Sequence, residues 1–226
     1  MTQPRSAKAF TAWPAIIAGL GMAYYLVAGV ALHFLRPDYS LLQSGMSCYA
    51  VGPWGWLETA AFALDGLSLA ALTAGLWRGI APQGRSRAGL LLLGLVAVGR
   101  ILEAALPTDV PPGPVPRTPV GVAHFGVAFL VFLAVTAAVL LISRRLAKDA
   151  AWRPFAPTAR ALALATLLAL VAFFGDTLAV GLFRDAGLDL NVAGLIQKAF
   201  LVLWHVWALL MAHHLRFGAT AAQAGA

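Results

Sequence analysis

Eight ionisable side chains interrupt the long apolar stretches of this 226-residue sequence. An ionised group in hydrocarbon is costly unless it is paired or reached by water, so each is a candidate for a functional site. These residues are Glu58, Asp65, Arg100, Glu103, His124, Asp176, Lys198 and His205. Four of them are candidate catalytic residues, because their side chains could exchange a proton or act on a substrate: Asp65, His124, Asp176 and His205.

Two pairs of these residues share a helix face. Glu58 and Asp65 are seven residues apart, and so are Lys198 and His205, which is close to two turns of an α-helix. Asp65 and His205 lie roughly 16 Å from the outer ends of their helices, near the midplane of a hydrocarbon core about 30 Å thick. The inner half of the apolar stretches is almost free of charge. We therefore expect a polar pocket that opens to the outside.

A purely structural role is the alternative for these charges. Arg100 and Glu103 are three residues apart and can pair along one helix. Lys198 could pair with Asp176 on a neighbouring helix. Pairs of this kind would only fix the register of the helices, since buried ion pairs can be structural as well as functional.

The candidate chemistries differ in how well the sequence supports them. Metal-dependent hydrolysis would use His124, Asp176, His205 and a glutamate, but the sequence has no HExxH motif. We therefore expect no metal, and the absence of a glycine-rich phosphate loop predicts no nucleotide cofactor. A serine nucleophile from residues 40–47 lacks a GxSxG elbow. A proton relay through Asp65 and His205 is chemically sound, since histidine titrates near neutral pH.

The composition places this chemistry in a membrane. The chain is 61% hydrophobic and 11% charged, whereas soluble domains are about 25% charged. The formal net charge of +7 does not indicate nucleic-acid binding, because the basic residues lie between apolar runs. Cys48 is the one cysteine of the sequence, which excludes an intramolecular disulfide. The first apolar run is too long for a signal-peptide core, so we expect an uncleaved helix.

Six segments are long and apolar enough to span a bilayer, which needs about 20 residues. We expect an all-α, polytopic transmembrane helix bundle that forms one domain over residues 1–226. Pro14 and Pro119 are expected in the first turns of their helices, Thr118 as an N-cap and Asn191 as another. The predicted helices are residues 13–35, 54–77, 88–106, 119–142, 159–182 and 192–215.

The basic residues predict the orientation. Arg36, Arg117 and Arg184 lie on one side of the predicted spans, and eleven Lys and Arg residues lie on the other. The positive-inside rule then places both termini in the cytoplasm. We expect a multi-pass protein of the plasma membrane with membrane lipids as its neighbours.

The connection between the first two helices, residues 36–56, is the longest polar and aromatic segment between two apolar runs. On this topology it faces outward. We expect it to act as a lid over the pocket, with Asp65 and His205 as the floor, and we refer to it as the lid segment. Tyr39, Ser47 and Tyr49 are its candidate ligand-binding residues, together with the eight ionisable residues named above.

Several short motifs resemble those of a bacterial and archaeal membrane family, the domain of unknown function 998. They are RPDY and SCYAVGPWGW in the lid segment, LPTD with Pro107 and Asp109 after the third helix, and TPVGVAHFG with Gly121 and His124 at the start of the fourth. The resemblance implies a bundle of six or seven helices. It implies no reaction and assigns no catalytic role.

Three functions follow from this reading. We favour binding or modification of a lipid or other amphiphile from the outer leaflet, because an apolar pocket with a few convergent polar groups is typical of such sites. A proton-coupled transporter that uses Asp65 and His205 is the second, and a structural partner of other membrane proteins is the third. Whether the protein is an enzyme stays open, and no nucleic-acid partner is expected.

Overall fold

The computed structural model describes residues 5–109, 116–183 and 191–218. Within them, six helices are long and apolar enough to cross a membrane. A 3-10 turn lies in the lid segment, and a short π-helical turn follows the last helix. The elements are α1 (Arg5–Leu35), η1 (Met46–Ala50), α2 (Gly55–Gly79), α3 (Arg87–Ala105), α4 (Pro119–Leu146), α5 (Ala156–Phe183), α6 (Ala193–His213) and η3 (His214–Gly218).

The predicted all-α bundle of six spanning helices is confirmed, and side-chain caps fix several of the ends. Ser86 and Thr118 each accept a hydrogen bond from the backbone N–H three residues further on, at 3.2 and 3.0 Å. The Asn191 side chain accepts from the N–H of Ala193 at 3.3 Å, but the N-cap position of α6 itself is Val192, one residue later than predicted. Another expectation was wrong: α1 begins at Arg5, so Pro14 lies inside the helix and not in its first turn. The polar residues before the apolar span are themselves helical.

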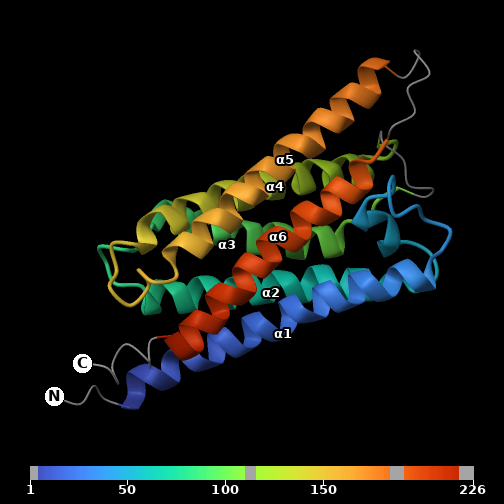
Figure 1. The fold of residues 1–226 in the computed structure, drawn as a ribbon. Helices are drawn as coiled ribbons and strands as arrows, with labels where there is room; N and C mark the ends of the chain where they lie inside the picture. The colour runs from blue at the N-terminus through green and yellow to red at the C-terminus, as the bar shows by residue number, and fades with distance from the viewer. Residues whose placement is uncertain (1–4, 110–115, 184–190, 219–226) are drawn as a thin grey trace.

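Helices α1 to α4 pack one after another along the chain, and α6 crosses them diagonally (Figure 1). Helix α6 contacts α1, α4 and α5, so it closes the bundle over its centre. Helix α5 packs on α4 and α6 and is the least buried of the spans. Large apolar side chains such as Leu20, Leu91 and Leu168 are exposed on the outside, which suits contact with lipid.

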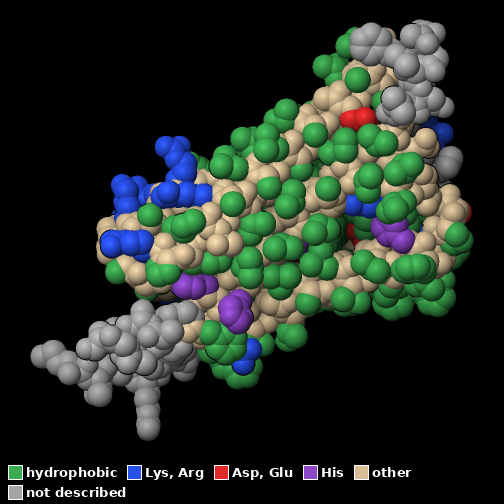
Figure 2. Space-filling model, in the orientation of Figure 1, with side chains coloured by type: hydrophobic (Ala, Val, Ile, Leu, Met, Phe, Trp, Pro, Cys, Tyr) green, Lys and Arg blue, Asp and Glu red, His purple; other side chains and the backbone are tan. Residues whose placement is uncertain are grey.

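The helix ends divide into two groups at opposite ends of the bundle (Figure 1). The lid segment lies at one end. The first residues of α1, the last of α6 and the α2–α3 and α4–α5 connections lie at the other. Lys and Arg side chains gather over that second end (Figure 2). The first residues of α1 and the last of α6 lie at the same end, as an even number of spans requires. The cytoplasmic orientation of that end stays a prediction. Arg184, one of the three basic residues predicted on the opposite side, lies outside the described residues.

Candidate functional site

Arg36 holds the two ends of the lid segment together. Its Nε and Nη2 donate to the carboxylate of Asp38 at 2.9 and 2.7 Å. Its Nη1 donates to the backbone carbonyls of Val51 and Pro53 at 2.6 and 3.0 Å, and its guanidinium lies 4.4 Å from the centre of the Tyr39 ring. The hydrogen bonds from Arg36 lower the pKa of Asp38 and raise the pKa of the arginine. The segment is therefore a closed loop and not an open connection.

The lid segment is fastened to the N-terminal end of α6. Lys198 Nζ donates to the backbone carbonyls of Leu41, at 3.2 Å, and of Ser44. Two residues after Ser44, the N–H of Met46 donates to the side-chain oxygen of Gln197 at 2.8 Å. Two adjacent side chains of α6 thus supply the side-chain hydrogen bonds that hold the middle of the loop.

The pair of Lys198 and Asp176, which the structural alternative offered, does not form. Lys198 makes its hydrogen bonds to backbone carbonyls of the lid segment and of Gly194. The four ion pairs found in the described part of the chain do not include Asp176. Asp176 lies half-buried on the peripheral helix α5. The Lys198 ammonium group donates to carbonyls of the lid segment and not to the Asp176 carboxylate.

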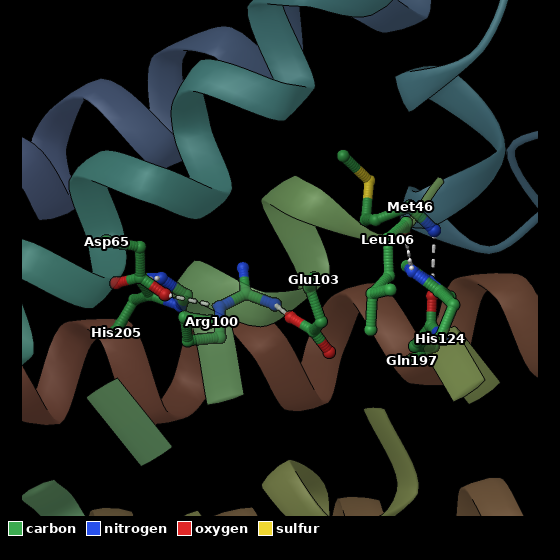
Figure 3. A network of polar contacts seen from close by, with 8 residues as sticks. All are labelled: Met46, Asp65, Arg100, Glu103, Leu106, His124, Gln197 and His205. Carbon is green, nitrogen blue, oxygen red and sulfur yellow. Dashed lines mark hydrogen bonds and ion pairs between the residues drawn. The ribbon is translucent and has the colours of Figure 1, made fainter. Parts of the chain in front are cut away.

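A buried chain of charges joins α2, α3 and α6 (Figure 3). Arg100 Nε donates to Asp65 Oδ2 at 2.7 Å, and Arg100 Nη1 donates to Glu103. His205 Nε2 lies 3.3 Å from the other oxygen of Asp65. The Arg100–Glu103 pair is the one that the sequence spacing predicts. Asp65 and His205 are fully buried, and Arg100 is 2% exposed.

Aromatic rings enclose this cluster. The ring of His205 stacks on Tyr25, with 4.2 Å between ring centres and 7° between planes, and lies against Trp204. The guanidinium of Arg100 lies 4.9 Å from the ring centre of Tyr25 and 4.5 Å from that of Phe62. Such contacts stabilise a cation when water is excluded. These aromatic residues could not be predicted from the sequence, because an aromatic side chain in an apolar helix gives no signal that distinguishes a site from a core.

The hydrogen bond of His205 to its own helix restricts where a proton can lie. His205 Nδ1 is 2.7 Å from the backbone carbonyl of Leu201, and since a carbonyl can only accept, Nδ1 carries a hydrogen. A neutral imidazole then has a bare lone pair at Nε2, facing an oxygen of Asp65. The two atoms can hydrogen-bond only when a further proton lies between them. A proton shared between them would give both atoms the hydrogen-bond partner that they lack in the described structure.

The cluster also has more acids than bases. Glu58 lies on the same face of α2 as Asp65, is fully buried, and neither of its carboxylate oxygens has a hydrogen-bond partner in the described structure. Glu58, Asp65 and Glu103 thus face one arginine, Arg100. A net negative charge at this depth is unfavourable unless protons or a cation balance it. No group of three side chains in the described residues is placed to hold a metal ion.

A small cavity lies between the lid segment and the charged cluster. Its volume is about 30 Å³, which is enough for one or two water molecules. Met46 and Ser47 line it from the lid, and Arg100 and Glu103 line it from below. The expectation that Asp65 and His205 form its floor was wrong. The long side chain of Arg100 lies nearer the lid, so Asp65 and His205 lie behind it (Figure 3).

His124 lines the same cavity and is held by the turn that precedes its helix. His124 Nδ1 is 2.7 Å from the carbonyl of Leu106, and the Thr118 hydroxyl donates to Asp109. Hydrogen bonds from the backbone N–H groups of Arg117 and Thr118 lower the pKa of Asp109. Any Cβ at Gly121 would lie on the Asp109 carboxylate. The LPTD and TPVGVAHFG motifs are thus two sides of one contact.

The structure sorts the predicted site residues into three groups. Asp65, Arg100, Glu103 and His205 form the buried chain of charges, with Glu58 beside them. Ser47 and His124 line the cavity above it, and Lys198, Tyr39 and Tyr49 belong to the lid and its attachment: the Tyr49 ring lies 5.1 Å from that of Tyr39 and 5.9 Å from Lys198 Nζ. Asp176 lies apart from all of these.

Comparison with known proteins agrees with the resemblance seen in the sequence motifs. A family model described as "Protein of unknown function (DUF998)" matches residues 17–214, which is most of the chain. No curated protein and no solved structure matches. With its six apolar helices, the chain is a multi-pass integral membrane protein, and it belongs to the DUF998 family.

Proposed function

We propose that this protein binds the polar head of a lipid or small amphiphile from the outer leaflet of the plasma membrane, with both termini in the cytoplasm. One observation carries the proposal: a cavity that is lined by the lid segment on one side and by buried charged groups on the other. Arg100 and Glu103 face Ser47 and Gln197 across it. Apolar surroundings with a few convergent polar groups are the usual form of a small-molecule site.

The cavity offers both donors and acceptors to a ligand. Arg100 Nη2 is buried and has no hydrogen-bond partner in the described structure, so it can donate to an oxygen of the bound head. The Glu103 carboxylate and the Gln197 side chain line the same space and can accept from hydroxyl or amine groups. A head that carries both kinds of group, such as a hydroxylated or amine-bearing one, would satisfy these atoms.

A volume of about 30 Å³ admits only water-sized occupants, so a larger head enters when the lid segment moves. The attachment of that segment suits such a movement. Hydrogen bonds from Lys198, to Gln197, and from the Leu195 N–H to the Leu42 carbonyl hold its middle. Arg36 keeps the loop itself intact. The lid can therefore lift from α6 without losing its internal hydrogen bonds.

A pair of tryptophan substitutions in the lid tests this proposal. Ser47→Trp places a large ring in the cavity and leaves the charged cluster unchanged, whereas Gln43→Trp adds the same ring at an exposed lid position. The amphiphiles retained by each purified protein are extracted and quantified by mass spectrometry. We expect the native protein and Gln43→Trp to retain the same compound and Ser47→Trp to lose it. Equal retention by all three proteins would disprove binding in this cavity.

Proton-coupled transport is the second candidate function, and the Asp65–His205 pair favours it. His205 Nε2 and Asp65 Oδ1 lie 3.3 Å apart and have no other hydrogen-bond partner in the described structure, so they could share a proton, and Arg100 connects this pair to the cavity. Protonation and release at such a pair could drive a conformational change.

Proteoliposomes that contain a pH-sensitive dye test the second function. The proteoliposomes of each protein are formed with the same extracted lipid. An imposed pH gradient should dissipate faster with the native protein than with the Asp65→Asn variant. Asp176→Asn is the matched control, because it removes an intramembrane acid that lies outside the cluster. If Asp65→Asn moves protons as fast as the native protein does, this function is excluded, while the binding experiment stands on its own.

A further inference from the structure

A second, larger cavity lies at the end of the bundle opposite the lid segment. Its volume is about 780 Å³, and it lies between the α2–α3 connection and the last turns of α4. This volume is within the range of small-molecule sites, about 300–1,000 Å³. Five of the side chains that line it are basic: Arg85, Arg87, Arg144, Arg145 and Lys148. Figure 2 shows basic side chains gathered on this end.

The backbone holds two of these arginines in place. Arg85 donates through Nε and Nη2 to the carbonyl of Ile80, at 3.2 and 2.9 Å, and its guanidinium lies 4.7 Å from the ring centre of Trp77. Arg145 Nη2 donates to the carbonyl of Gln83 at 3.0 Å. These contacts orient the two guanidinium groups. They do not neutralise the positive charges, because backbone carbonyls and an aromatic ring carry no net negative charge.

The nearby acid does not neutralise the cluster. Asp149 is buried, and its two carboxylate oxygens accept from the backbone N–H groups of Ala81 and Ala151, at 2.8 and 2.9 Å. None of the ion pairs in the described residues involves a basic residue of the cavity. Five like charges around one space repel one another, so an anion in the cavity would relieve that repulsion.

The chemistry and depth of the cavity select a class of anion. A guanidinium group matches phosphate through paired hydrogen bonds, and four of the five basic residues are arginine. The cavity lies where α3 begins and α4 ends, which is the level of lipid headgroups for spanning helices. Leu141, one turn deeper on α4 than Arg145, adds an apolar wall.

We propose that this cavity binds a phosphate-bearing anion with more than one negative charge. Anionic phospholipid headgroups and soluble phosphate compounds share this chemistry. The site does not depend on the function proposed for the outer cavity, because it shares no residue with it.

Native mass spectrometry of the detergent-purified protein tests the site with four probes: cardiolipin, phosphatidylglycerol, phosphatidylcholine and inorganic pyrophosphate. The test variant is Arg144→Gln with Lys148→Gln. The matched control is Arg153→Gln with Arg216→Gln, which removes the same charge outside the cavity. We expect saturable binding of cardiolipin that is roughly thirtyfold weaker in the test variant and unchanged in the control.

A third variant separates the cavity from its charge. Ala88→Trp fills the cavity from the first turn of α3 and keeps all five basic residues, so we expect it also to weaken binding. Pyrophosphate binding that displaces cardiolipin would identify a soluble phosphate compound as the ligand, and cardiolipin binding without pyrophosphate binding would identify a lipid. Equal weakening in the test and control variants, or unsaturable binding of all four probes, would overturn the proposal.

Discussion

Replacement of Arg100 by glutamine is the most direct test of what the buried charges contribute. In the native protein Arg100 is 2% exposed and pairs with Asp65 on α2 and Glu103 on its own helix. Glutamine keeps a polar side chain of moderate length but removes the positive charge. The two carboxylates, and Glu58 beside them, then face one another without a cation.

The expected cost follows from burial. Removal of one partner from a buried ion pair destabilises a protein by about 3–5 kcal/mol, because the other charge is left uncompensated. For a chain of this length, each kcal/mol lowers Tm by about 2–4 °C. We therefore expect Arg100→Gln to lower Tm by roughly 6–20 °C. Thermal unfolding in detergent, followed by the fluorescence of the seven tryptophans, measures this shift.

A triple variant decides whether charge is the cause. Asp65→Asn and Glu103→Gln, added to Arg100→Gln, remove the three charges that pair in the native protein and leave Glu58 as the remaining acid beside them, while the shape of the cluster changes little. We expect the triple variant to regain most of the lost stability. Arg153→Gln, an exposed arginine, should shift Tm by no more than about 2 °C. The reasoning is refuted if Arg100→Gln behaves like this surface control, or if the triple variant is no more stable than Arg100→Gln alone.

Three further predictions concern the end of the bundle that carries the lid segment. Gly121→Ala should destabilise by about 1–3 kcal/mol, because its Cβ would displace the Asp109 carboxylate, whereas Gly126→Ala on the same helix meets open space and should be neutral or stabilising in the same unfolding assay. Because the folded state lowers the pKa of Asp109, the Tm advantage of the native protein over Asp109→Asn should be complete above the unfolded value of about 3.9. This Tm advantage should disappear as the pH falls through the pKa of Asp109 in the folded protein, which is the lower of the two values. Arg36→Gln removes the hydrogen bonds that close the loop, so amide hydrogen exchange across residues 36–56 should rise while α2 and α3 stay protected; unchanged exchange would show that packing alone holds the lid.

The spanning helices could be predicted because length, hydropathy and capping residues all point to the same boundaries. Thr118 and Pro119 mark the start of α4 in the sequence, and the structure confirms both. Spacing along a helix also predicted which charges share a face. The Arg100–Glu103 pair lies within one helix and needs no knowledge of how helices pack.

The partners across helices could not be predicted, because they depend on how the bundle closes. The sequence offered Asp176 to Lys198, but backbone carbonyls of a loop about 150 residues away in the chain are its hydrogen-bond acceptors. The same limit applies to the floor of the cavity. Depth along the helix correctly placed Asp65 and His205 near the centre, but it could not show that Arg100 would extend between them and the lid.

Helix α6 connects the two functions proposed for the half of the protein that lies nearer the lid segment. Gln197 and Lys198 hold the lid segment, and His205, about two turns deeper on the same helix, faces Asp65. A ligand that lifts the lid and shifts α6 would change the distance between His205 and Asp65 and, under the second proposed function, the affinity for the proton that they share. Linkage then requires the reverse effect of equal size: proton binding must change the affinity for the ligand. Uptake or release of a proton on ligand binding would join the two functions in one mechanism, whereas ligand binding without proton exchange would leave the lid cavity as a binding site alone.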